Sequence, residues 1–563
     1  MINPPRAFFC IDRGTATTAA SIVGRVGGRW RLLGSASFPS TVEPDAVLGL
    51  LVARLRAADP ELAADLGAPA GDPPVAGHPG PRRPDALVDL AMAPADLASV
   101  PWPRVQALSV APGTLAILAP TERRRVVLAS AAVGSGWRVT SASLERSDAL
   151  ETMAVVLGRD VRAVLVGAGA QASPDERDGL RTLGPMLAAI AERRPEIAIV
   201  LAGAAAQHQA AIEGAGAVPG SVVVMREGGG AGPSAEALRI ILDDLRGEPS
   251  DSRRGIARAT ATLAAILGRR VETAEIGMSG GVRAAAGRWL GREDEPARRT
   301  AIVAAAGIAR EEPDDELLDG VIAWSSVAID RPRLRDRLRE LWLAPWAEAH
   351  GEGALLRLTA ARAALQRLVQ ATPEFDDLGS PDLLVIAGGV WSVAPTPAVA
   401  VAVMDVVRRN GVTQLVLDHA RILGPIGTIG DDAERAALLA DLVDDVLVPL
   451  GTAVMPQGLR TGRYLGRAVL HRRGAATVDH ELVAGSLVTL DVPPGEVGAV
   501  ELEFRDGVVL GGRGRRFAVD VAGGMAGVLV DLRDVPLRLP DRLERRRELL
   551  AAWQQPLWSP LES

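Results

Sequence analysis

Buried strands alternate with amphipathic helices along much of this sequence. VRAVLVGAGA at 161–170 is apolar and ends in glycines, residues 175–194 have the spacing of an amphipathic helix, and EIAIVLAGAAA at 196–206 is a second apolar run. Two buried strands joined by a helix form a βαβ unit, which requires the strands to be parallel. The pattern therefore predicts an α/β protein.

The same alternation returns in the second half of the chain. A strand runs into a glycine turn at 271–281, a long helix covers 354–371, and a strand at 381–390 ends in paired glycines. A helix over 396–410 and a strand over 412–418 complete a second predicted βαβ unit.

Length and local composition divide the chain into domains. A chain of 563 residues is too long for one hydrophobic core. We predict a first α/β domain over 1–255, with a Pro/Gly-rich insertion near 68–86, and a second over 256–450. From 451 to 563 short strands separated by Gly and Pro predict a small β-rich domain that ends in a charged helix.

The N-terminal segment 7–38 alternates as three antiparallel strands would. Asp12 ends the first strand, and the turn after it carries glycine and hydroxyl residues, namely Gly14, Thr15, Thr17 and Thr18. Backbone N–H groups and hydroxyls can bind phosphate oxygens, and an acid at the strand end can hold a hydrated Mg²⁺. An ordinary hairpin turn is the alternative interpretation.

A second turn of this kind follows the apolar strand at 271–276. It contains an acid, glycines and a hydroxyl residue, namely Glu275, Gly277, Ser279, Gly280 and Gly281. A later strand ends in Gly388 and Gly389. Two such turns and a glycine pair predict a nucleotide cleft.

This order of segments resembles the actin-like ATPase superfamily, in which two related domains clamp ATP. DLLVIAGGVWSVAPTPAVAVAVMDVV, GVTQLVLDHARILGPIGTI, LVPLGTAVMPQG and LVTLDVPPGEVGAVELEF look like successive blocks of the MutL/GlmL-type accessory proteins of glutamate mutase. The resemblance implies two actin-like (ribonuclease H-like) domains with mixed sheets and a C-terminal β-rich domain. It also implies ATP or ADP with Mg²⁺ as ligands, and an adenosylcobalamin-dependent mutase or aminomutase as the partner to be reactivated.

Residue by residue, the resemblance is incomplete. Asp12 and Glu275 take the catalytic positions, with Asp12 holding Mg²⁺ through water, while Ala19 stands where the family has Lys. Glu275 itself replaces an Asp, and GAGAQAS at 167–173 lacks the acid of a third block. Because carboxylates position Mg²⁺ and the attacking water, these changes predict slow ATP hydrolysis or none.

Two other functions stay open beside a nucleotide-binding accessory protein. The first is a non-enzymatic pseudo-ATPase scaffold for protein contacts, which the missing acids favour. The second is a small-molecule kinase, which is disfavoured because no evident catalytic acid follows a substrate loop.

Composition excludes several further classes. The chain has no lysine, so its 62 basic residues are all arginine and a P-loop or Schiff-base lysine is impossible. A net charge of −7 with dispersed arginines argues against nucleic acid as a partner, and no apolar run is long enough to predict a membrane span. The single cysteine, Cys10, lies in a predicted core strand and fits a cytoplasmic protein. The six histidines show no metal-ligand spacing.

Overall fold

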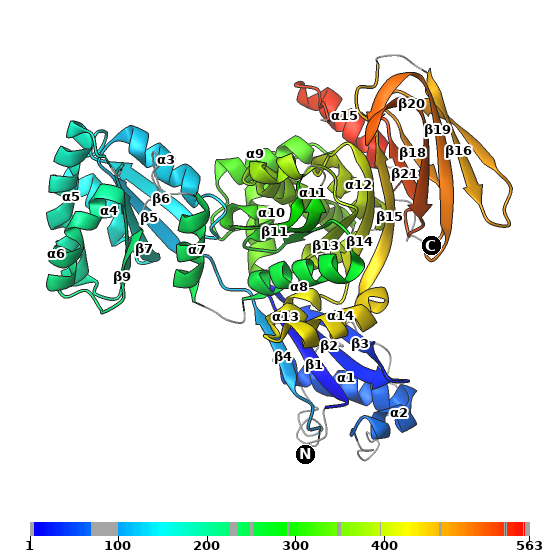
Figure 1. The fold of residues 1–563 in the computed structure, drawn as a ribbon, viewed down its shortest axis with the longest axis horizontal. Coiled ribbons are helices and arrows are strands. Elements are labelled where there is room, and N and C mark those ends of the chain that lie inside the picture. The colour runs from blue at the N-terminus through cyan, green and yellow to red at the C-terminus, as the bar shows by residue number, and fades with distance from the viewer. Residues whose placement is uncertain are drawn as a thin grey trace. The chain divides into compact units, whose positions relative to one another are not determined.

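The computed structural model describes residues 5–68, 100–169, 171–225, 235–247, 251–289, 292–345, 351–394, 396–460, 464–533, 535, 537–554 and 557. The chain divides into two compact units (Figure 1). The first comprises 1–110, 249–300 and 306–563, and the second comprises 111–248 with 301–305. The expected first domain over 1–255 thus spans parts of both units, and the boundaries after 255 and 450 stay predictions. The Pro/Gly-rich stretch near 68–86 lies almost wholly outside the described residues.

A four-stranded sheet in the order β3-β2-β1-β4 forms the N-terminal part of the first unit. Strands β1 to β3 are antiparallel, which confirms the prediction for 7–38, and β4 pairs in parallel with β1. Helices α1 and α2 each begin with Pro, whose fixed φ suits a first helical turn. The bounds are β1 (Ala7–Arg13), β2 (Thr17–Val26), β3 (Arg29–Pro39), α1 (Pro44–Ala58), α2 (Pro60–Asp65) and β4 (Arg104–Leu108).

An eight-stranded mixed sheet in the order β12-β11-β10-β13-β14-β15-β21-β18 repeats this arrangement. Strands β10 and β11 form an antiparallel hairpin, and β13 pairs in parallel with β10, as β4 does with β1. The bounds are β10 (Val271–Ile276), β11 (Gly281–Trp289), β12 (Arg292–Val303), β13 (Leu383–Ala387), β14 (Gly411–Asp418), β15 (Leu447–Met455), β18 (Leu487–Leu490) and β21 (Val528–Asp531).

Helices surround this second sheet. They are α8 (Ser252–Leu267), α9 (Asp315–Trp324), α10 (Arg331–Leu343), α11 (Gly351–Gln370), α12 (Thr396–Val406), α13 (Leu423–Thr428) and α14 (Asp432–Val446). The helix expected at 354–371 is α11, and the one expected at 396–410 is the shorter α12. Strands β13 and β14, which α12 connects, are parallel, so the second βαβ unit is confirmed.

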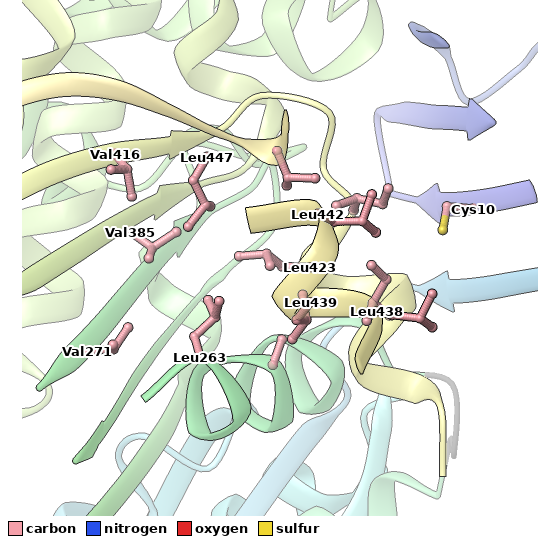
Figure 2. Close-up of a cluster of buried hydrophobic side chains, with 14 of the residues drawn as sticks. Cys10, Leu263, Val271, Val385, Val416, Leu423, Leu438, Leu439, Leu442 and Leu447 are labelled. Atoms are coloured by element: carbon pink, nitrogen blue, oxygen red, sulfur yellow. The ribbon is translucent and has the colours of Figure 1, made fainter. Parts of the chain in front are cut away.

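One hydrophobic core joins the N-terminal sheet to the second sheet (Figure 2). Cys10 of β1, Leu263 of α8, Val385 of β13 and Leu442 of α14 are buried members of the same cluster. Burial of such side chains contributes roughly 1.5–3 kcal/mol each. The core therefore fixes the end of β1 relative to the ends of β10, β13 and β14.

The strands after residue 451 divide between two sheets. Strands β17-β16-β19-β20 form an antiparallel sheet, whereas β18 and β21 extend the eight-stranded sheet. Leu470 and Leu502 of the former share a core with Val528 of the latter. The bounds of the remaining elements are β16 (Tyr464–Arg472), β17 (Val478–Val483), β19 (Val497–Leu510), β20 (Gly512–Ala522) and α15 (Leu543–Gln554).

The second unit contains a five-stranded, fully parallel sheet in the order β6-β5-β7-β8-β9. The βαβ unit predicted at 161–206 is its β7-α5-β8. The segment 167–173 therefore belongs to a different compact unit from Asp12. The bounds are β5 (Thr114–Ala119), α3 (Glu122–Ala132), β6 (Arg138–Ser143), α4 (Ala149–Leu157), β7 (Val161–Gly167), α5 (Pro174–Arg193), β8 (Ala198–Ala202), α6 (Gln209–Gly214), β9 (Val222–Met225) and α7 (Ala235–Arg246).

Candidate functional site

The first predicted turn closes the β1–β2 hairpin. The Gly14 N–H donates to the Thr17 carbonyl at 3.0 Å, and the Ser40 hydroxyl donates to the Gly14 carbonyl at 2.8 Å. A Cβ on Gly14 would lie 2.5 Å from the Thr17 carbonyl oxygen, so the turn requires glycine. Thr15 is exposed, whereas Thr18 is fully buried with its hydroxyl 3.3 Å from that of Ser40.

The second predicted turn closes the β10–β11 hairpin, where the Gly277 N–H donates to the Gly280 carbonyl at 2.9 Å. Gly281 begins β11 opposite Ile276, and a Cβ on it would lie 2.7 Å from the Glu275 carbonyl oxygen. This turn faces the first one, because the hydroxyls of Ser279 and Thr15 are 3.5 Å apart. The structure therefore brings the two predicted turns together.

The glycine pair after β13 completes the same site. Gly388 has a φ of 103°, and a Cβ on it would lie only 2.0 Å from the Ile276 carbonyl oxygen. A Cβ on Gly389 would lie 3.0 Å from the Thr17 hydroxyl. Glycine at both positions lets the end of β13 approach both hairpins.

Asp12 is buried and engaged by two side chains that the sequence interpretation missed. The Ser252 hydroxyl donates to one carboxylate oxygen at 3.0 Å. Arg421 contacts the other oxygen with Nε at 2.8 Å and Nη2 at 2.6 Å. Both oxygens of the acid expected to hold hydrated Mg²⁺ therefore bind protein donors.

Arg421 also binds the phosphate turn itself. Its Nη1 donates to the Thr17 hydroxyl at 2.8 Å, and its Nη2 donates to the Thr17 carbonyl at 3.2 Å. Cβ atoms on Gly14 and Gly389 would lie 3.1 and 3.3 Å from its guanidinium nitrogens. The guanidinium therefore lies between the first turn and the glycine pair.

The backbone around Arg421 explains its position. Strand β14 ends at Asp418, whose carboxylate accepts the N–H groups of Ile422 and Leu423 at 3.1 Å each. This tight reversal places Arg421 at a φ of 55°, a left-handed conformation that costs a non-glycine residue roughly 1–2 kcal/mol. Its buried contacts with Asp12 and Thr17 offset that cost.

Glu275 is the second predicted catalytic acid. It is buried, and its Oε2 has no hydrogen-bond partner among the described residues. Burial raises the pKa of Glu275 to about 7, although the nearby Arg253 opposes the rise. The structure thus places an acid with a pKa near neutral pH beside the turns of the β1–β2 and β10–β11 hairpins.

The space between the turns is small. The cavity lined by Thr15, Glu275, Ser279, Gly388 and Arg421 has a volume of about 40 Å³. Small-molecule sites are usually about 300–1,000 Å³. A neighbouring cavity of about 280 Å³ shares Thr17, Gly388, Gly389 and Arg421 with it. In this conformation the residues do not fit Mg-ATP, since Asp12 is engaged and Arg421 occupies the space.

A local sequence signal accompanies Arg421, which the sequence interpretation left out of the site. It stands in LDHARILG directly after a buried strand, and strand ends are where the other site residues lie. Its partner in the N-terminal hairpin is not recognisable from spacing.

Within the described ranges, no group of three or more His, Cys, Asp or Glu residues could hold a metal ion. Searching those same ranges also finds no helix with the length and apolar character needed to cross a membrane.

Comparison with solved structures finds only remote similarities, at low sequence identity. Nucleotide-free acetone carboxylase is 12% identical, with a TM-score of 0.28 over 84% of this chain and 80% of that one. A chain of the PilM-PilN type IV pilus biogenesis complex is 13% identical, with a TM-score of 0.23 over 77% and 98%. A ROK family glucokinase from Streptomyces griseus, with glucose and AMPPNP, is 12% identical, with a TM-score of 0.24 over 74% and 97%.

No protein-family model matches the chain, and no curated protein matches it. The similarities to solved structures are too remote to indicate a function.

Proposed function

We propose that this protein is an accessory protein with two actin-like sheets that acts through protein contacts and does not hydrolyse ATP. The observation that carries the proposal is the buried ion pair between Arg421 and Asp12, with Ser252 on the remaining carboxylate oxygen. An acid that holds a hydrated Mg²⁺ needs free oxygens facing the phosphates. Here a guanidinium neutralises that acid from inside the protein.

Opening the site for nucleotide would require Arg421 to leave Asp12. Both side chains are less than 10% exposed. Separating such a pair leaves an uncompensated buried charge, at a cost of about 3–5 kcal/mol. The buried pair therefore supports a pseudo-ATPase in preference to an ATP-driven enzyme.

One observation favours a second function, a protein that binds nucleotide with a degenerate ATPase site. The two glycine turns still face each other, and Thr15 and Ser279, whose hydroxyls are 3.5 Å apart, both line the cavity. Arg421 lines both this cavity and its larger neighbour, so its release would enlarge the space beside the turns. No comparable site feature favours the small-molecule kinase.

Calorimetric titration of Mg-ATP and Mg-ADP separates these functions. We expect no saturable binding at nucleotide concentrations up to about 1 mM, where binding free energies are about −4 kcal/mol, and no phosphate release. Arg421→Ala tests whether removing the guanidinium restores binding, and Arg473→Ala, at an exposed position, is the matched control. Saturable binding to the unaltered protein, with phosphate release abolished by Asp12→Asn, would refute the proposal.

The partner is proposed from the family resemblance, as a subunit of an adenosylcobalamin-dependent mutase or aminomutase. Sedimentation of the protein with such a mutase, with and without Mg-ATP, tests this step. A complex that forms equally well without nucleotide supports a scaffold. A complex that forms only with Mg-ATP supports a nucleotide-gated reactivating protein, and a protein that sediments alone in both cases argues against this partner.

A further inference from the structure

A second cavity, of about 670 Å³, lies in the same unit beside the connections that enter β13 and β14. Arg408, Arg409 and Asn410 from the link between α12 and β14 line it, together with Trp324 of α9 and Arg546 of α15. Its volume falls in the range of about 300–1,000 Å³ that small-molecule sites occupy. Gly388 and Asp418 mark the opposite, carboxyl ends of β13 and β14, so this cavity is separate from the Asp12 site.

Among the residues that the structure describes, buried arginines outnumber buried acids beside this cavity. The five guanidiniums share three carboxylates, through contacts of 2.7–3.0 Å, and every side chain of the cluster is at most 10% exposed. The cluster consists of Arg283, Arg362, Arg408, Arg409 and Arg533 with Glu272, Asp405 and Asp531. Its formal charge is +2, and an uncompensated buried charge is costly.

Two of these arginines retain donors with no acceptor among the described residues. Arg283 and Arg409 both donate to Glu272 at 2.7 Å, but the Nη2 of each has no hydrogen-bond partner among the described residues. Arg283 is 1% exposed and Arg409 is 10% exposed in their side chains. Both line the cavity. An unsatisfied buried donor costs roughly 1–3 kcal/mol.

The other charged residues in the described lining leave this excess in place. Arg546 adds one positive charge, and the exposed Asp376 adds one negative charge. Trp324, Val369 and Val407 supply an apolar wall. Burial lowers the pKa of Arg409, and the charge of Glu272 opposes this shift.

We propose that this cavity binds a small organic dianion, a phosphate monoester or a dicarboxylate, whose charged group pairs with Arg283 and Arg409 and whose apolar part lies against Trp324. Paired arginine donors match the oxygens of both groups, because guanidinium forks bind carboxylate and phosphate in a bidentate manner. The proposal does not depend on nucleotide binding at the Asp12 site.

Calorimetry on the full chain tests the proposal with three probes of known charge. Phenyl phosphate and glutarate are the dianions, and phenol is the neutral control. We expect saturable binding of at least one dianion and none of phenol. Arg409→Gln should weaken that binding at least about 10-fold, which is a loss of about 1.4 kcal/mol.

Two further variants test whether misfolding, instead of the lost Arg409 charge, explains weaker dianion binding. Arg546→Gln changes a half-buried residue of the terminal helix and should weaken binding by a smaller factor, whereas Arg473→Gln at an exposed position should not change it. Dianion binding lost in Arg409→Gln and weakened in Arg546→Gln supports the site. No saturation by either dianion at about 10 mM, or equal binding by all variants, would overturn it.

Discussion

The guanidinium of Arg421 lies 2.6 Å from the carboxylate of Asp12, although the two residues are 409 positions apart in the sequence. Strand β1 supplies the aspartate, and the turn after β14 supplies the arginine. The core shown in Figure 2 holds these two strand ends together. The acid that the sequence offers as a metal ligand is thus part of an internal ion pair.

Breaking this pair should destabilise the first unit strongly. Arg421→Ala leaves the Asp12 carboxylate buried without its partner, so we expect the free energy of unfolding in urea to fall by about 3–5 kcal/mol. The double variant Asp12→Ala/Arg421→Ala should lose less than the sum of the single losses. Arg6→Ala, which breaks an ion pair that is more than 60% exposed, should cost less than about 1 kcal/mol. Strict additivity in the double variant would mean that the pair contributes no coupling.

The buried Glu275 should make stability fall as pH rises toward neutrality. Its pKa is about 7 in the folded protein against an ordinary value of 4.5, so between these pH values the folded state binds more protons than the unfolded state. The stabilisation is complete below about pH 4.5 and is lost as pH passes 7. Glu275→Gln cannot ionise and should be more stable than the unaltered protein at pH 8, by up to about 3 kcal/mol.

Urea unfolding at a series of pH values from about 4.5 to 8 measures this effect as the difference between the two proteins. Burial also raises the pKa of Asp418, to about 6. Because Asp418 is present in both proteins, its contribution to the pH dependence cancels in this difference. Glu501→Gln, at a side chain that is 66% exposed, is the control and should follow the unaltered protein. If the free energy of unfolding of Glu275→Gln changed with pH as steeply as that of the unaltered protein, the raised pKa of Glu275 would be wrong.

Gly388 should not tolerate a side chain. Its φ of 103° disfavours any other residue, and an added Cβ would lie 2.0 Å from the Ile276 carbonyl oxygen, a backbone atom that cannot rotate away. Gly388→Ala should therefore cost at least about 3 kcal/mol, more than backbone strain alone. Gly495→Ala is the matched control, because its φ is 83° with nothing within 4 Å of the added Cβ. Equal losses of stability for the two variants would show that the contact between β13 and β10 is not tight.

Cys10 should be unreactive in the folded protein. The thiol is 2% exposed, and burial raises the pKa of Cys10 well above its ordinary value, so almost no thiolate forms at neutral pH. We expect no colour with a disulfide reagent such as DTNB in native buffer, and one equivalent in denaturant. Rapid native labelling would indicate that β1 leaves the core readily.

The strand and helix patterns predicted local structure well where burial repeats regularly. The three N-terminal strands and both βαβ units lie where the apolar runs are, because a buried strand or an amphipathic helix face is a local pattern. Association of the strands was less predictable. Strands β18 and β21 look like the other short strands after 451, yet they extend the eight-stranded sheet.

The candidate site shows the same division. Asp12, the glycine turns and Gly388 could be recognised because tight turns at strand ends require particular residues. Ser252 and Arg421 could not be assigned to Asp12, since each reaches it only after distant segments have packed together. Thr18 was predicted as a phosphate-binding residue, but its side chain is buried and its hydroxyl lies beside that of Ser40.

The sequence by itself determined the α/β class, the absence of a lysine that could bind phosphate and the two glycine turns, because these depend on residue identity and short-range periodicity. Only the tertiary structure decided that 111–248 with 301–305 forms its own unit and that a guanidinium occupies the space between the turns. It also gathered five arginines around three acids beside one cavity. The physical reason is that buried charges are neutralised by whichever groups the folded core brings within a few ångströms, and that choice is not encoded in any local stretch.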